Sequence, residues 1–284
     1  MKKIDRKIKL AIIITTIIIL FVLFFLWQNN SITVSEHEYS NPKIPSDFLG
    51  YKIVHISDLH NKMFGQDQSK LLGEVVSLRP DIVIITGDLV DRRKFDLEKA
   101  MCFIDGAVKI APIYFVSGNH EAWSGMYPEI KDRLLASGVI VLDDTFTEIL
   151  KGDGSIKLFG LADPGFSNGG NRSIEASTEA LDRLVSDWSE DEDFKVLLTH
   201  RPELFEHYCD NNIDLIFAGH AHGGQFRIPF IGAVFAPDQG FFPEYTSGSY
   251  AEEDSTMFVS RGLGNSIIPI RIFNRPEIIS VTFN

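Results

Sequence analysis

Cysteine and positive charge are both scarce in this sequence, and each shortage excludes a class of protein. The 284 residues include two cysteines, Cys102 and Cys209. That number excludes a disulfide-rich scaffold and a structural zinc site built from thiolates. The two could form one bridge, but each lies in a helix-like segment, so two buried free thiols are expected. The net charge of -12 argues against a nucleic-acid-binding protein, because contacts to phosphate backbones need lysine and arginine.

Charge is absent altogether from the segment Leu10 to Trp27, LAIIITTIIILFVLFFLW. A membrane-spanning helix needs about 20 mostly apolar residues. Five basic residues and one acid precede this segment, and Glu36 and Glu38 follow it. The asymmetry predicts a single-pass anchor over residues 10–27, with residues 1–9 as a basic cytoplasmic tail and the rest of the chain outside the cell membrane.

Two other interpretations compete with this uncleaved anchor. A cleaved signal peptide has a shorter apolar core, of about 7–15 residues, followed by small residues at the cleavage site. The sequence WQNNSITVSEHE, which begins with the last residue of the apolar segment, contains no such site. A buried core helix is the third interpretation, but a run that is apolar on all sides is difficult to place inside a domain of this size. The anchor is therefore favoured.

The rest of the chain divides into a linker and one α/β domain. Residues 28–48 are polar and contain Pro42 and Pro45, which predicts a linker without regular structure. In residues 49–284, strand-like and helix-like segments alternate, which predicts βαβ units and a largely buried sheet. Strands are expected at residues 51–57, 81–86, 112–117, 139–142, 145–150, 156–161, 195–199, 214–217, 256–260 and 278–283. Helices are expected at residues 68–78, 94–108 and 174–187.

Several of the predicted strands end in residues that ligate metals. The five segments are Ser57-Asp58-Leu59-His60, Thr86-Gly87-Asp88, Ser117-Gly118-Asn119-His120-Glu121, Thr199-His200 and Gly219-His220-Ala221-His222. In open α/β sheets, ligands bind beyond the carboxyl ends of the strands. We therefore expect two aspartates, one asparagine and five histidines in one crevice.

Each of these segments taken alone has an ordinary structural explanation. Asp-x-His and Gly-Asp after a strand are common in turns, and His200 could be a buried, hydrogen-bonded histidine. The ordered set is much more specific, and it predicts a metal site. Eight ligand-type groups exceed the needs of one tetrahedral ion, whereas two ions about 3.5–4 Å apart that share a carboxylate would use them. Imidazole and carboxylate together suit Mn, Fe or Zn. The remaining histidines, His37, His55 and His207, are expected to be structural or exposed.

This ordered set resembles that of the calcineurin-like metallophosphoesterases, from about residue 50 to the end of the chain. Residues 223–225, 228–230 and 236–240 look like a bacterial, membrane-associated branch of that family. Glu121 stands where many members have aspartate. The resemblance implies a four-layer α-β-β-α sandwich of two mixed sheets. It also implies two metal sites, whose residues are Asp58, His60 and His222 for one, Asn119, His200 and His220 for the other, and Asp88 as the bridge.

The same resemblance implies the activity. His120 would be the catalytic residue, which protonates the leaving oxygen or stabilises charge on the phosphoryl group. Two cations would lower the pKa of a bridging water and neutralise phosphoryl oxygens. The sequence thus predicts a membrane-anchored phosphoesterase acting on a phosphodiester or pyrophosphate bond of a lipid-linked or cell-envelope substrate. An extracytoplasmic phosphomonoesterase or nucleotide hydrolase is the alternative, followed by a metal-stabilised binding protein without activity.

The spacing of His220 and His222 predicts the conformation of the backbone between them. Two residues at i and i+2 share a direction only if the chain between them is extended. Each histidine could then reach one of two neighbouring ions. The surrounding glycines would let backbone and substrate phosphate approach closely.

Other residues carry weaker expectations. Asp91 could orient a neighbouring group or lie in a solvated loop. Arg201 and Arg261 are expected in surface salt bridges, with contact to phosphate as the alternative. The aromatic segment from Phe230 to Tyr250 either forms an apolar rim beside the site or packs against the second sheet.

Overall fold

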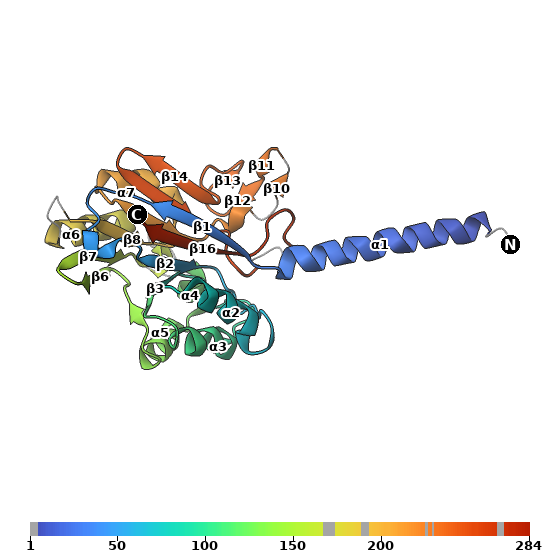
Figure 1. The fold of residues 1–284 in the computed structure, drawn as a ribbon, viewed down its shortest axis with the longest axis horizontal. Coiled ribbons are helices and arrows are strands. Elements are labelled where there is room, and N and C mark those ends of the chain that lie inside the picture. Colours follow the sequence, from blue (N-terminus) through green and yellow to red (C-terminus); the bar gives the residue numbers. More distant parts are fainter. Residues whose placement is uncertain (1–4, 167–173, 189–192, 225–226, 229, 266–269) are drawn as a thin grey trace.

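The computed structural model describes residues 5–166, 174–188, 193–224, 227–228, 230–265 and 270–284. Gln225 and Pro229 of the sequence motifs lie outside these residues. In the described part of the chain, one long helix, α1 (Arg6–Asn30), projects from an α/β domain (Figure 1). Its 25 residues span about 37 Å at 1.5 Å per residue. By length and composition, α1 is able to cross a membrane.

Two six-stranded mixed sheets form the centre of the domain. The first has the order β1 (Thr33–Tyr39), β16 (Glu277–Phe283), β2 (Lys52–Ile56), β3 (Ile82–Thr86), β4 (Ile113–Val116) and β5 (Ile140–Val141). The second has the order β14 (Gly248–Glu252), β15 (Ser255–Val259), β9 (Leu215–Ala218), β8 (Lys195–Leu198), β7 (Gly154–Gly160) and β6 (Thr145–Lys151). The strands that precede the predicted ligands run parallel within each sheet: β2, β3 and β4 in the first, and β8 and β9 in the second.

The helices cover the outer faces of the two sheets. The helices that pack on the first sheet are α2 (Ser69–Leu78), α3 (Leu97–Ala107) and α5 (Tyr127–Ala136). The second sheet is covered by α6 (Ile174–Trp188) and α7 (Phe205–Asp210). A third apolar core lies between the sheets. Because successive side chains on a strand face opposite ways, Ile84 of β3 enters the core between the sheets and Ile85 enters the helix-covered one. The predicted four-layer α-β-β-α fold is confirmed.

The expected absence of regular structure between residues 28 and 48 is wrong in two places. The helix α1 continues to Asn30, and β1 pairs in parallel with β16 from Thr33↔Glu277 to Tyr39↔Phe283. Only two residues separate α1 from β1. The apolar helix therefore joins the first sheet directly, without a flexible tether, and His37 lies in a strand.

The remaining short elements follow or interrupt the main strands. Helix α4 (Asn119–Ser124) begins directly after the loop that leaves β4. Two small antiparallel hairpins, β10 (Arg227–Ile228) with β11 (Gly232–Ala233) and β12 (Phe235–Ala236) with β13 (Gly240–Phe241), follow the histidines after β9. Cys102 of α3 and Cys209 of α7 are both free thiols, as expected, although Cys102 is only partly buried.

Candidate metal centre

The loops that leave β2, β3, β4, β8 and β9 carry all eight predicted site residues to one place. Asp58, His60, Asp88, Asn119, His120, His200, His220 and His222 are each no more than 6% exposed. Buried polar side chains of this kind need partners. The structure therefore brings together the residues that the strand-end pattern singled out.

One group of ligand-type atoms comes from the β2, β3 and β9 loops. Asp58, His60, Asp88 and His222 each offer one atom, and these atoms all lie within 4.8 Å of one another. His222 Nε2 is 3.1 Å from His60 Nε2 and 3.3 Å from Asp58 Oδ1. Among the described residues, the buried Asp58 Oδ1 has no hydrogen-bond partner. An unsatisfied carboxylate oxygen beside two imidazole nitrogens fits a cation.

A second group shares Asp88 with the first and adds His200 and His220. His200 Nε2 lies 3.2 Å from His220 Nδ1 and 3.1 Å from Asn119 Oδ1. Asp88 Oδ2 is 3.4 Å from His200 Nε2 and 3.6 Å from His60 Nε2. This single carboxylate oxygen therefore lies between the two groups.

Hydrogen bonds on the far sides of two rings decide which nitrogens face the second group. His200 Nδ1 is 2.7 Å from the carbonyl oxygen of Thr86, which can only accept, so Nδ1 carries the proton. His220 Nε2 is 2.8 Å from Asp238 Oδ2, an acceptor, and 2.9 Å from Arg201 Nη1, a donor, so these contacts orient the ring without fixing which nitrogen carries the proton. In a neutral His200 ring, Nε2 then presents a lone pair toward His220 Nδ1, beside the oxygens of Asn119 and Asp88. An imidazole nitrogen that faces a second imidazole, an amide oxygen and a carboxylate fits a metal ion that replaces a proton.

The charges in the centre follow from burial and from Asp88. Burial lowers the pKa of His60 to about 3, although Asp88 opposes this. Burial also lowers the pKa of His200, but the charge of Asp88 outweighs it and raises the pKa to about 10. For Asp88, burial raises the pKa, whereas His200 and His120 outweigh it and hold the pKa well below the usual value. A metal ion at His200 would therefore compete with a proton, and its binding would tighten as the pH rises.

The backbone at the site is left-handed where the spacing of the histidines predicted an extended chain. His220 and His222 have φ of 63° and 50°, so that expectation is wrong. The two rings still reach different groups, one each. Asp58, His60 and Asp88 also have φ near 50°. Non-glycine residues adopt this region at a cost, and such strain clusters at functional sites.

The glycines of the motifs let the ligand loops touch. A Cβ atom on Gly118 would lie 2.4 Å from Asp88 Oδ1, and one on Gly87 would lie 2.5 Å from the nitrogen of Gly118. A Cβ on Gly219 would lie 2.0 Å from Ser57 Oγ. The glycines are thus needed for contact between neighbouring loops.

Glu121, noted in the sequence only as a variation, organises the β3 and β4 loops. Its carboxylate accepts hydrogen bonds from the backbone nitrogens of Asp88 at 2.7 Å, Gly118 at 2.8 Å and Val90 at 3.1 Å. Burial, with Asp88 nearby, raises its pKa to about 7 despite these bonds. Glu121 therefore fixes the position of Asp88 relative to helix α4.

Sequence reasoning missed the supports of His220 and His222. Asp238, in the β12–β13 turn, holds His220 and also pairs with Arg201, whose Nε is 2.5 Å from Asp163 Oδ2. Arg201 thus makes ion pairs, as expected, but in a buried place. Asn274 Nδ2 donates to the carbonyl oxygen of His222 at 2.6 Å. Asp238 lies in the segment 236–240 that the resemblance includes, but no local pattern shows that it contacts His220 or that Asn274 contacts His222.

The weaker expectations have mixed outcomes. Asp91 Oδ1 lies 3.6 Å from His120 Nδ1, beside the site. Arg261 pairs with Glu277 at 2.6 Å, as expected. Of the aromatic segment, Tyr245 and Tyr250 pack against the outer core of the second sheet, whereas several phenylalanines are exposed.

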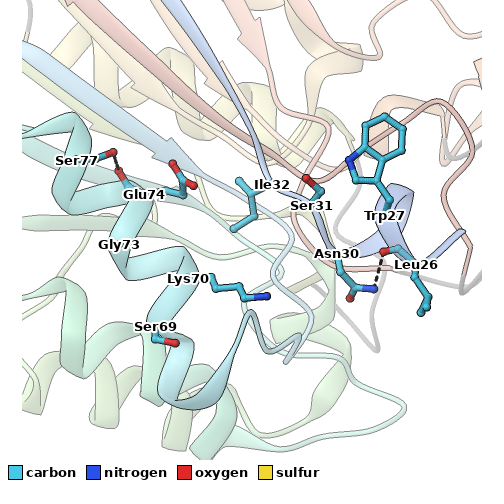
Figure 2. Close-up of a pocket in the computed structure, with 10 residues that line it drawn as sticks. All are labelled: Leu26, Trp27, Asn30, Ser31, Ile32, Ser69, Lys70, Gly73, Glu74 and Ser77. Carbon is cyan, nitrogen blue, oxygen red and sulfur yellow. Dashed lines mark hydrogen bonds between the residues drawn. The ribbon is translucent and has the colours of Figure 1, made fainter. Parts of the chain in front are cut away.

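A cavity of about 600 Å³ lies apart from these ligands, between the end of α1 and helix α2 (Figure 2). Trp27, Asn30 and Ile32 line one side, and Lys70 and Glu74 line the other. None of the eight site residues lines it. It marks instead the junction of the apolar helix with the domain.

Substituting Gly219 by alanine tests the close packing of the ligand loops. The new methyl group would collide with Ser57 and Asp58, so the free energy of unfolding should fall by about 1–3 kcal/mol and metal content should fall with it. Urea unfolding and metal analysis measure both. Gly73→Ala is the control, because that position in α2 has open space, and it should stabilise the fold by about 0.5–1 kcal/mol. Equal behaviour of the two variants would contradict the packing argument.

Comparison with known proteins places this centre in a family. The model of the calcineurin-like phosphoesterases matches residues 51–224. The chain is 30% identical to the metallophosphoesterase YkuE of Bacillus subtilis, over 90% of this chain and 86% of that protein. It is 29% identical to the phosphodiesterase YaeI of Escherichia coli, over 80% of each chain. It is 27% identical to the UDP-2,3-diacylglucosamine pyrophosphatase LpxG of Chlamydia trachomatis, over 93% of this chain and 94% of that protein.

A solved structure shares the fold. A dimetal phosphatase from Danio rerio superimposes with a TM-score of 0.50 at 12% identity, over 76% of this chain and 88% of that one.

The family match extends from β2 to the residues just after His222 and so includes all eight site residues. The chain belongs to the calcineurin-like phosphoesterase family and is a metal-dependent phosphoric ester hydrolase.

Proposed function

We propose that this protein is a membrane-anchored phosphoesterase that uses two divalent ions, of Mn, Fe or Zn, and hydrolyses a phosphodiester or pyrophosphate bond of a lipid-linked or cell-envelope substrate. The observation that carries the proposal is the position of Asp88 Oδ2, 3.4 Å from His200 Nε2 and 3.6 Å from His60 Nε2. A carboxylate shared by two ligand groups is suited to bridge two cations.

Each ion would have its own set of side chains. Asp58, His60 and His222 would hold one, and Asn119, His200 and His220 would hold the other. Bound cations of this kind lower the pKa of water and neutralise charge on phosphoryl oxygens. The carbonyl oxygen of Thr86 fixes the tautomer of a neutral His200 ring, which leaves the lone pair of Nε2 facing the centre, and Asp238 orients the ring of His220.

His120 would act on the substrate and not on a metal. Its Nδ1 accepts a hydrogen bond from the backbone nitrogen of Arg92 at 3.2 Å, which leaves the proton of the neutral ring on Nε2. Burial lowers the pKa of His120, although Asp88 and Asp91 oppose this. A neutral ring with a proton on Nε2 can donate a hydrogen bond to a phosphoryl oxygen as negative charge develops there.

The membrane part of the proposal rests on α1 and its flanks. The basic residues before the apolar segment 10–27 favour a cytoplasmic N-terminus and a catalytic domain on the other side. Gln28 and Asn29, at the end of α1, accept hydrogen bonds from the backbone nitrogens of Asn274 and Arg271. A helix whose last turn is bonded to the folded domain supports an anchor that is retained. The diacylglucosamine substrate in the name of LpxG supports a substrate with acyl chains here.

Metal loading and two chromogenic esters test the activity. Full-length protein in detergent, loaded separately with Mn, Zn or Fe, should hydrolyse bis(4-nitrophenyl) phosphate faster than 4-nitrophenyl phosphate. The Asp88→Asn variant is the inactive control. A preference for the monoester would replace the proposal by a phosphomonoesterase. Two bound metals per chain without turnover of either ester would favour a binding protein.

A further inference from the structure

The two small hairpins that follow His222 expose an unusual amount of apolar surface. Phe230 is fully exposed, and Phe241 and Phe242 are 75% and 73% exposed. Exposed apolar side chains also occur in the same hairpins at Ile228, Ile231 and Phe235. Contiguous apolar patches on a soluble surface mark a contact with another apolar phase. We call these six residues the hairpin patch.

The hairpins that carry the patch, β10–β11 and β12–β13, lie at the end of the domain from which α1 emerges (Figure 1). The surface between the two is also apolar, because Phe273 and Ile270 are 51% and 41% exposed. The ring of Phe273 lies 5.7 Å from that of Phe24 in α1. An apolar surface thus runs from the helix onto the domain.

Contacts at the end of α1 fix the direction in which this surface faces. Asn29 Oδ1 accepts from the nitrogen of Arg271 at 2.9 Å, and Gln28, which is 3% exposed, accepts from that of Asn274 at 3.3 Å. The guanidinium of Arg275 stacks 4.9 Å above the ring of Trp27. With α1 bonded to the domain in this way, the domain cannot turn freely about its anchor.

The same loops connect the patch to the metal centre. Asn274 holds the carbonyl oxygen of His222, and β10 begins five residues after that histidine. Asp238, in the turn between β12 and β13, holds His220. A membrane that contacts the hairpins would therefore also lie beside the two ligand groups.

We propose that the hairpin patch, together with Phe273 and Ile270, is a membrane-contact surface that inserts into the headgroup region of the bilayer spanned by α1. This proposal rests on the anchor in the proposed function and deepens it. Because α1 would hold these apolar side chains next to the point where it leaves the bilayer, lipid is the apolar phase within their reach. The metal centre would then take its phosphoester from the lipid surface and not from bulk solution.

Depth-dependent fluorescence quenching tests the surface in the full-length protein. The native cysteines are replaced by alanine, and single cysteines are introduced by Phe230→Cys, Phe241→Cys, Leu150→Cys and Ile18→Cys. Each is labelled with a nitrobenzoxadiazole dye and reconstituted into phosphatidylcholine–phosphatidylglycerol vesicles containing nitroxide-labelled lipids. Leu150 is the matched control, because it is 71% exposed on β6, at the other end of the domain (Figure 1).

The expected result is quenching at positions 230 and 241 by nitroxides near the headgroup, at least threefold stronger than at position 150. If position 18 is quenched but positions 230 and 241 are quenched no more than position 150, the proposed membrane-contact surface is wrong and the anchor stands. Absence of quenching at position 18 as well would overturn both. Protection of positions 230 and 241 from aqueous iodide without lipid quenching would assign the patch to a protein partner or a second copy, against the proposal.

Discussion

The Asp88→Asn variant is expected to lose diester turnover by roughly 10³-fold or more, since several kcal/mol of charge stabilisation depend on the two cations that this carboxylate would bridge. Asp88 Oδ1 accepts a hydrogen bond from the nitrogen of His120 at 2.7 Å, and an amide oxygen can keep that bond. The amide nitrogen would then replace Oδ2, which faces His60 and His200. An uncharged N–H donor at that point repels cations.

Metal analysis of the purified Asp88→Asn variant should show loss of metal beside the loss of turnover. Asp143→Asn is the matched control, because Asp143 is also a carboxylate near the β4 loop and accepts from the nitrogen and the hydroxyl of Ser117, outside the ligand groups. It should keep both metal content and turnover. Full activity of Asp88→Asn with two metals bound would contradict the bridging role.

The effect of the Asp143→Asn substitution on stability should depend on pH. Burial raises the pKa of Asp143 to about 6, so the folded state holds this proton more tightly than the unfolded chain. Its contribution to stability is present below pH 4 and is lost as the pH rises through 6. Asparagine does not titrate, so Asp143→Asn should cost less stability at pH 7 than at pH 4.

The positions of the site residues were predictable because they depend on a local signal. Each apolar run stops at a polar ligand type, and parallel strands bring their carboxyl ends to one edge. The runs before Asp58 and Asp88 are buried strands that pair in parallel, and those before His200 and His220 do the same in the second sheet. Local sequence and topology therefore agree at the candidate ligands.

The sequence could not predict features that depend on distant contacts. Strand β1, with the polar pattern TVSEHEY, is stabilised by pairing with β16, which lies more than 230 residues later. Asp238 reaches His220 through a hairpin turn, and Asn274 reaches His222 from the chain before β16. The left-handed backbone at His220 also depends on a distant contact. The backbone nitrogen of His220 donates a hydrogen bond to Asp58 Oδ2, which lies in the loop after β2. Residue spacing contains none of this information.

Removal of the His120 ring is expected to separate catalysis from metal binding. His120→Ala should lower kcat by about 10²–10³-fold, the range for loss of one preorganised donor, while metal content stays unchanged, because the ring belongs to neither ligand group. His60→Ala is the contrasting variant. The ring of His60 lies 4.4 Å from that of His120, but its Nε2 is one of the clustered ligand atoms, so metal content should fall.

The dependence of the His120→Ala loss on the leaving group decides how the ring acts. A neutral imidazole that donates from Nε2 stabilises phosphoryl charge with any leaving group, so the loss should be similar for nitrophenyl and alkyl diesters. His120→Gln, which can donate but not transfer a proton, should recover part of the rate. A loss much larger for the alkyl diester, with no recovery by glutamine, would contradict this assignment. Proton transfer to the leaving oxygen would then be the role of His120, because an alkoxide needs a proton far more than a nitrophenoxide does.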